Sequence, residues 1–199
     1  ESLGNCGALT DFNIEGNRIQ GELPDTICNL TSIVEFRLER NLFSGPLPPC
    51  IGGGWGRDGN YYPGMRNLTY LFLSYNMFSG LIPQSIGGLK MASTIFLHRN
   101  QFAGPLPDVF DDVPLTNSIT LIENPNLQPG IPASLARHMR EEPLRIKIDP
   151  RMFGCRLGYQ PPSEDYWHRF EIDNATWRSM DVCSPCPPGH FRVDGIDFC

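Results

Sequence analysis

The stretch NLFSGPLP, residues 41–48, decides the fold because close copies of it return at a fixed distance along the chain. The copies are NRIQGELP from Asn17, NMFSGLIP from Asn76, NQFAGPLP from Asn100 and a looser NPNLQPGIP from Asn124. Successive copies are 24, 35, 24 and 24 residues apart, so one interval carries an insertion of 11 residues. A period of about 20 to 30 residues is typical of solenoid proteins, in which each repeat forms one coil.

A pair of apolar residues spaced two apart precedes each of these Asn residues. The pairs are Phe12 and Ile14, Phe36 and Leu38, Leu71 and Leu73, Ile95 and Leu97, and Ile119 and Leu121. Apolar residues at that spacing lie on one face of a short strand. We therefore expect one short strand in each coil, and the same face of each strand to be buried.

Each position that follows the strands has a physical reason. An Asn amide donates and accepts, so stacked Asn residues are expected to form a ladder of hydrogen bonds to the backbone at the end of each strand. Two residues later, an apolar side chain is expected to stack in an inner spine, formed by Ile19, Phe43, Phe78 and Phe102. The Gly that follows suits a backbone conformation that other residues resist, and the Pro ends the strand.

The segment LTYLFLSYNMFSGLIPQSIGGLK, residues 68–90, resembles a leucine-rich repeat of the plant type, whose pattern is LxxLxLxxNxFxGxIPxxIGxL. The resemblance covers roughly residues 1–150. It implies a right-handed α/β solenoid with a parallel β-sheet on its concave face and a second, shorter strand near the G-x-I/L-P segment. It also implies binding work, since members of this family serve as receptor ectodomains, adhesion proteins and inhibitors of secreted enzymes.

The repeats suggest how the chain is divided. Residues 1–150 are expected to form about five repeats and a degenerate sixth strand in LRIKID, with an insertion at residues 52–64 and a short helix within residues 133–142. Residues 151–182 are expected to be a cap. Residues 183–199 resemble the start of a cysteine-rich module of the tumour-necrosis-factor-receptor, ephrin-receptor or EGF type. Since the chain opens in mid-repeat and stops on a Cys, we expect the natural protein to extend beyond both ends.

The cysteines indicate a secreted protein. Cys28 and Cys50 fall in adjacent coils at nearly the same phase, which predicts a disulfide. In the terminal module we expect Cys155–Cys183 and Cys186–Cys199, with a zinc site as the competing interpretation of Cys183-x-x-Cys186. Cys6 aligns with buried Leu positions and is predicted to be a free core thiol. Three sequons, at Asn29, Asn67 and Asn174, predict N-linked glycans and agree with a secreted protein. We expect Asn29 and Asn67 at the same position of their repeats, just before a strand.

Several function classes are disfavoured. The net charge of −6 without a basic patch argues against nucleic acid, and no apolar run approaches the roughly 18 residues of a membrane helix. We find no nucleophile elbow, phosphate-binding glycine loop or zinc-protease motif, so we expect neither an enzyme nor a cofactor nor a metal.

The predicted concave face carries the candidate binding residues. The outward positions give an exposed aromatic patch with arginines and a histidine nearby: Tyr70, Phe72, Tyr75, Phe96, Arg37, Arg40, Arg99 and His98. Exposed aromatics beside Arg are typical of binding hot spots, although aromatic pairs across strands also stabilise a sheet. The insertion adds Trp55, Tyr61 and Tyr62, which either contact a partner or fold back on the coil.

The sequence therefore predicts an extracellular or cell-surface module that binds a protein or glycan through its concave face without catalysis. The first alternative is a structural block of an extracellular fibre, coat or matrix that stacks on copies of itself. The second is an inhibitor of a secreted enzyme that degrades cell walls.

Overall fold

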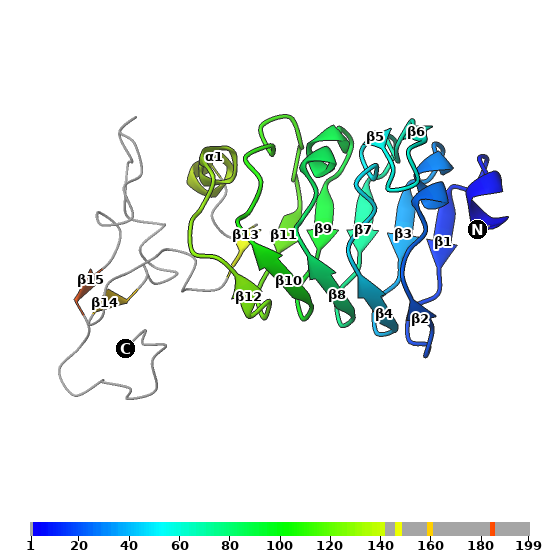
Figure 1. Ribbon diagram of the computed structural model, residues 1–199. Coiled ribbons are helices and arrows are strands. Elements are labelled where there is room, and N and C mark those ends of the chain that lie inside the picture. The colour runs from blue at the N-terminus through cyan, green and yellow to red at the C-terminus, as the bar shows by residue number, and fades with distance from the viewer. Residues whose placement is uncertain (1, 142–145, 149–158, 161–183, 186–199) are drawn as a thin grey trace.

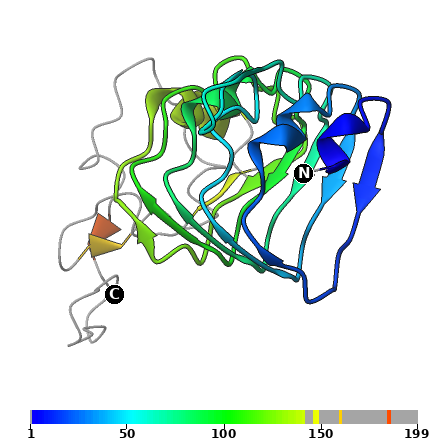
Figure 2. The ribbon, with the colours of Figure 1, turned by 45° about the vertical axis from the view of Figure 1, so that its right-hand side comes forward.

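The chain folds into a solenoid of stacked coils. We describe it from a computed structural model for residues 2–141, 146–148, 159–160 and 184–185. Figure 1 shows one strand of each coil aligned in a central sheet, with a second sheet along one edge of the stack and short helices along the other. Figure 2 shows that the stack is curved.

The central sheet is parallel and, within the described residues, has six strands in the order β1-β3-β7-β9-β11-β13. Its strands are β1 Asp11–Asn13, β3 Glu35–Arg37, β7 Tyr70–Phe72, β9 Thr94–Phe96, β11 Ser118–Thr120 and β13 Ile146–Lys147. From β1 to β11 the repeat phase is kept, since Phe36 pairs with Leu71, Leu71 with Ile95, and Ile95 with Ile119. The predicted solenoid and its parallel sheet are thereby confirmed. The degenerate sixth strand is present as β13, but Ile146 pairs there with Ile119, so this last step is longer than the 24-residue repeat.

The remaining elements follow the same period. The second sheet, also parallel, contains β2 Gln20–Gly21, β4 Leu42–Gly45, β8 Met77–Gly80, β10 Gln101–Gly104 and β12 Asn126–Leu127. The 3₁₀ helices are η1 Ser2–Asn5, η2 Asp25–Asn29 and η3 Gln84–Gly88, and the α-helix is α1 Ala133–Glu141. Two antiparallel pairs complete the described elements: β5 Gly54–Trp55 with β6 Tyr61–Tyr62, and β14 Tyr159–Gln160 with β15 Ser184–Pro185.

A Pro sets the start of the helix in three coils. Pro24 and Pro83 directly precede η2 and η3, and Pro132 directly precedes α1. Pro24 and Pro83 have extended backbone, which ends the preceding segment before the chain turns. The predicted helix within residues 133–142 is confirmed as α1, at the place in its coil that η2 and η3 occupy in theirs.

The core is a continuous column of apolar side chains along the stack. The strand residues Phe36, Leu71, Ile95 and Ile119 are all fully buried. The predicted phenylalanine spine is present, because the rings of Phe43 and Phe78 stack with centroids 6.0 Å apart and those of Phe78 and Phe102 with centroids 6.2 Å apart. Such contacts recur only if every coil has the same phase.

The predicted asparagine ladder joins each coil to the one before it. Asn76 shows the pattern: its Nδ2 donates to the Leu38 carbonyl of the preceding coil (2.9 Å), and its Oδ1 accepts from the Phe43 amide of that coil (3.1 Å). Asn41, Asn100 and Asn124 make the same two bonds, each to the coil that precedes it. The expected ladder is thus confirmed at four positions of the described chain.

Glycine is required where the second sheet ends. Gly104 has a φ of +73°, and a Cβ at this position would lie 2.3 Å from the Leu81 side chain of the preceding coil. The backbone conformation disfavours other residues, and any Cβ would also require the exposed Leu81 side chain to move. This agrees with the role predicted for the glycines of the repeat.

Two predictions for the first coil are wrong. Ile19 was expected in the spine but is 40% exposed, and Cys6 was expected in the core but is an exposed free thiol. The cause is the same: within the described chain no earlier coil covers these side chains. The predicted pairs Cys155–Cys183 and Cys186–Cys199, the cap and the cysteine-rich module lie outside the described residues, apart from the short pair β14 and β15.

Candidate functional site

Two parallel rows of side chains lie on the outward face of the central sheet and of the turns that follow its strands. Together we call them the concave wall. The first row contains Arg37, Phe72, Phe96 and Thr120, which are successive partners in the sheet register. The second row lies just beyond the strands and contains Arg40, Tyr75, Arg99 and Glu123, which occupy the same position of successive repeats. Repeat phase thus brings side chains from four coils onto one surface, because the strands that carry them lie side by side in the sheet.

The first row is a closely packed stack. The Arg37 guanidinium carbon lies 4.3 Å from the centroid of the Phe72 ring, and the rings of Phe72 and Phe96 meet edge to face with centroids 5.0 Å apart. The Glu35 carboxylate holds Arg37 in place from the same strand. A guanidinium over an aromatic ring contributes about 0.5–1 kcal/mol at an exposed site.

This packing corrects one expectation. Phe72 was predicted to be exposed, yet it is only 7% accessible, because Arg37, Tyr70 and Phe96 cover its ring. The Tyr70 ring stacks on it with centroids 6.1 Å apart and is itself 37% exposed. Phe72 therefore supports its neighbours, and the surface that a partner would touch is made by those neighbours.

The second row is held by the backbone as well as by contacts. Arg40, Tyr75, Arg99 and Glu123 all have positive φ, between 53° and 58°. This left-handed conformation is uncommon for residues other than Gly and costs about 1 kcal/mol or more per residue. The regular turn before each ladder Asn imposes it, and it projects the four side chains from equivalent points.

The side chains of the second row contact one another in sequence. The Tyr75 ring lies between two guanidinium groups, with Arg40 at 5.5 Å and Arg99 at 4.7 Å from its centroid. Arg99 in turn pairs with Glu123 at 2.8 Å. Tyr75 remains 38% exposed, and Arg40 is exposed as well. The row is therefore ordered but accessible.

Polar residues between the rows connect them. His98 meets the rings of Tyr75 and Phe96 edge to face, and its Nδ1 lies 2.8 Å from the Thr120 hydroxyl oxygen. Partial burial lowers the pKa of His98, which favours the neutral imidazole. The Ser74 hydroxyl donates to Glu39 at 3.0 Å, yet partial burial still raises the pKa of that carboxyl.

The concave wall thus offers aromatic surface and guanidinium donors in fixed positions. Six of the eight predicted binding residues lie in the two rows, and Tyr70 and His98 lie beside them. Two of the aromatic residues predicted to be exposed differ from the prediction, since Phe72 is buried and Phe96 is half-buried. No cluster of three or more potential metal ligands occurs in the part of the chain that the structure describes.

The insertion forms a hairpin, β5–β6, that projects beside the coil carrying η2 (Figure 1). Trp55 and Tyr61 are 68% and 60% exposed, whereas Tyr62 is only 5% exposed and folds back, donating its hydroxyl to Asp58 at 2.6 Å. Two of the three predicted contact residues are therefore available and one has a structural role. The hydrogen bond from Tyr62 and those from Asn60 lower the pKa of Asp58 to about 2.

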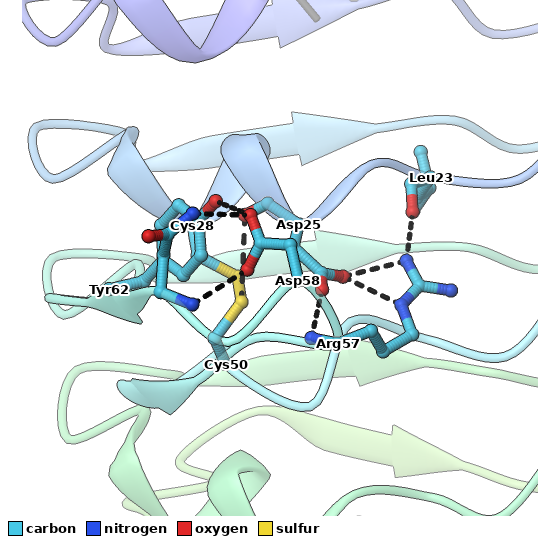
Figure 3. Close-up of a disulfide and its surroundings, with 8 residues drawn as sticks. Leu23, Asp25, Cys28, Cys50, Arg57, Asp58 and Tyr62 are labelled. Carbon is cyan, nitrogen blue, oxygen red and sulfur yellow. Dashed lines mark hydrogen bonds and ion pairs between the residues drawn. A yellow bond between two sulfur atoms is a disulfide. The ribbon is translucent and has the colours of Figure 1, made fainter.

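Sequence reasoning missed how the hairpin is attached. Arg57 extends to the preceding coil, where its Nη2 bonds Asp25 at 2.7 Å and the Leu23 carbonyl at 2.6 Å (Figure 3). Its Nη1 also bonds Glu22 at 3.1 Å. Asp25 is buried, so this ion pair fixes the tip of the hairpin. An isolated Arg in a glycine-rich insertion was the available signal, but its acidic partner lies 32 residues earlier.

The predicted Cys28–Cys50 disulfide is present beneath this hairpin, with Cα atoms 5.9 Å apart and both side chains buried (Figure 3). It links η2 to the segment from which the insertion departs. The amide of Gly64 also donates to the Cys28 carbonyl at 3.0 Å. The hairpin is thus tied to the neighbouring coil at both of its ends and at its tip.

The sequons differ in position from the expectation. Asn29 ends η2 and is half-buried, whereas Asn67 lies three residues before β7 and is exposed, so the two are not at one phase. They are still close in space, because the Asn67 Nδ2 donates to the carbonyl of Thr31, the third residue of the first sequon. Asn174 lies outside the described residues.

Comparison with known proteins identifies the repeat type. A family model described as Leucine Rich Repeat matches residues 8–30 and 67–89. No curated protein sequence matches the chain. Within the described residues no helix is both long and apolar enough to cross a membrane.

Solved structures extend the likeness across the coils. The ectodomain of the membrane receptor kinase GASSHO1/SCHENGEN3 from Arabidopsis thaliana, in complex with CASPARIAN STRIP INTEGRITY FACTOR 2, is 32% identical, with a TM-score of 0.56 over 68% of this chain and 15% of that one. The Arabidopsis receptor kinase HAESA, in complex with the peptide hormone IDA and the co-receptor SERK1, is 30% identical, with a TM-score of 0.56 over 67% and 20%.

A third neighbour has a different activity. A plant ice-binding protein is 26% identical, with a TM-score of 0.56 over 68% of this chain and 40% of that one. The chain spans 15% and 20% of the length of the two receptor structures, and therefore corresponds to only a few of their repeats. The fold is that of a leucine-rich-repeat solenoid, and its neighbours include extracellular parts of plant membrane receptors.

Proposed function

We propose that this chain is a non-catalytic recognition segment of an extracellular or cell-surface protein, and that it binds a protein partner through the concave wall. Its similarity to the receptor structures supports the class, since one of them is in complex with CASPARIAN STRIP INTEGRITY FACTOR 2 and the other with a peptide hormone and a co-receptor. The buried Cys28–Cys50 disulfide supports the compartment, because such bonds persist outside the cytosol.

The observation that carries the proposal is the position of Tyr75. Its ring is exposed yet held between Arg40 and Arg99, and all three residues sit in the left-handed conformation set by the repeat. Tyr and Arg are the residues most enriched at interface hot spots. Because their positions are already fixed, little conformational entropy is lost when a partner binds.

The dimensions of the wall favour an extended partner. Four neighbouring strands, from β3 to β11, contribute to it, and at about 4.8 Å between strands they span roughly 15 Å. An extended peptide segment of four or five residues has this length. Its backbone groups would face Arg40, Arg99 and His98, and its apolar side chains would face Tyr70, Tyr75 and Phe96.

The proposal can be tested with the purified chain and an array of secreted proteins and peptides. Ligands selected by the unmodified chain are then measured against Tyr75→Ala and Phe96→Ala. Removing a hot-spot side chain costs at least about 2 kcal/mol of binding free energy, so we expect each variant to bind at least about 30-fold more weakly. Ala accepts the left-handed position about as readily as Tyr, so the first change should not disturb the fold.

A matched control is Leu42→Ala, since Leu42 is 41% exposed, comparable with Tyr75, but lies on the second sheet. The Leu42→Ala variant should bind the selected ligands with unchanged affinity. Equal loss in the control, or none in the wall variants, would contradict the proposal. Concentration-dependent association of the chain without a ligand would favour the structural alternative, and suppression of a secreted wall-degrading enzyme would favour the inhibitor.

A further inference from the structure

We propose that Trp55 and Tyr61 form a second binding site, distinct from the concave wall, for an uncharged oligosaccharide. The two residues face each other across the antiparallel pair β5–β6. Their rings meet edge to face at an interplanar angle of 81°, with centroids 5.5 Å apart. They form an open corner of two aromatic surfaces at the outer face of the hairpin.

The rings are large, exposed and held in place. Both retain more than half of their accessible surface, while Tyr62, on the opposite face of the same hairpin, is buried against the coil. The Arg57 ion pair with Asp25 fixes the tip, and the Cys28–Cys50 disulfide fixes the base. A hairpin of two-residue strands is not stable alone, so these attachments are what keep the rings together.

The charges of the hairpin argue against an acidic ligand. Arg57 is neutralised by Asp25 and Glu22, and the Asp58 carboxylate accepts hydrogen bonds from Tyr62 and Asn60. The hairpin and its attachment carry two guanidinium groups and three carboxylates, a net charge of −1: Arg57 and Arg66 against Glu22, Asp25 and Asp58. An uncharged ligand therefore fits this surface better than a polyanion such as a uronic-acid chain or nucleic acid.

The size of the surface argues for a sugar rather than a protein. Trp55 and Tyr61 are the two large exposed side chains of the hairpin, and the residues between them, at positions 56–60, are polar or Gly. A stable protein interface buries about 800 Å² on each partner, which two rings cannot supply. A hexose is itself amphipathic, with C–H faces that pack on a ring and hydroxyls that accept from an indole N–H or pair with a phenol O–H.

The test is a titration of the intact ¹⁵N-labelled chain with cellohexaose, chitohexaose, xylohexaose and mannohexaose in turn. The indole N–H signal of Trp55 is assigned from its loss in Trp55→Phe, and the other two Trp residues of the chain serve as internal references. We expect at least one hexasaccharide to shift the Trp55 signal with saturation and a Kd at or below about 1 mM. Trigalacturonate, an acidic sugar, should bind at least tenfold more weakly.

Variants separate this site from others. Saturation-transfer NMR on the ligand should show at least a tenfold loss of affinity in Trp55→Ala and Tyr61→Ala, and none in Met91→Ala, whose side chain is similarly exposed but lies before β9. Tyr75→Ala should leave sugar binding intact, which keeps this proposal independent of the concave wall.

Three results would overturn it: no response of Trp55 to any of the four sugars, equal affinity in Trp55→Ala and the unmodified chain, or preference for trigalacturonate. Loss of a protein partner on Trp55→Ala, without any sugar binding, would assign the hairpin to the protein interface instead.

Discussion

Replacing Asn76 by Ala tests how the coils are held together. Asn76 is 8% exposed, and its Oδ1 accepts from the buried amide of Phe43, while its Nδ2 donates to carbonyls of Leu38, Leu73 and Ser74. Removing the side chain leaves the Phe43 amide without its acceptor, which costs about 1–3 kcal/mol, and the lost donor adds about 1 kcal/mol. We expect the free energy of unfolding to fall by about 2–4 kcal/mol.

Asn17→Ala is the matched control. Asn17 occupies the same position in the first coil, but it is exposed and bonds only the carbonyls of Ile14 and Glu15 in its own coil. Its loss should cost less than about 1 kcal/mol, because no buried group is left unpaired. The comparison therefore isolates the bonds between coils from those within one coil.

Urea unfolding monitored by circular dichroism, together with thermal melting, provides the measurement. For a chain of this length a loss of 2–4 kcal/mol lowers the midpoint temperature by roughly 5–15 °C. If Asn76→Ala and Asn17→Ala were equally mild, the ladder would not join the coils energetically, and the reasoning from buried unpaired groups would be refuted.

Three further results are expected. Replacing Cys28 and Cys50 by Ser removes a cross-link between positions 22 residues apart and should lower stability by about 3 kcal/mol, measured by urea unfolding; an unchanged midpoint would show that the bond adds nothing to the packing around it. Because burial raises the pKa of Glu39 above 4.5, stability falls as the pH rises from 4.5 to that raised value, and the loss is complete above it. Glu39→Gln should therefore be more stable than the unmodified chain at pH 7 and equally stable below pH 4.5, and a constant difference across that range would contradict this. Arg57→Gln should release the hairpin from Asp25 and speed its amide exchange with little change in global stability; unchanged exchange would mean that the ion pair does not fix the tip.

The solenoid could be predicted from sequence because each coil repeats the same local pattern. Asn41 and Phe43 have the same roles as Asn76 and Phe78, so one repeat predicts the next. The prediction failed at Ile19 and Cys6, where the pattern is intact but the neighbouring coil that would bury these side chains is missing from the described chain. Periodicity identifies the face on which a residue lies and leaves open what covers it.

The candidate surfaces were harder to predict for the same reason. The wall residues were assigned to one face correctly, yet the burial of Phe72 depends on how Arg37 and Phe96 from neighbouring strands pack over it. The attachment of the hairpin depends on Arg57 meeting Asp25 across 32 residues, in an insertion that follows no repeat. Contacts that do not recur from coil to coil cannot be inferred from the repeat pattern and are found only in the three-dimensional structure.

The most direct test of recognition by the concave wall is hydrogen–deuterium exchange of the whole chain, with and without a protein partner selected from the array. Binding should slow amide exchange in peptides that cover residues 70–76 and 94–100, which carry Tyr75, Phe96 and Arg99. Protection confined to the hairpin at residues 52–64, or to the second sheet at residues 42–45 and 77–80, would contradict the account.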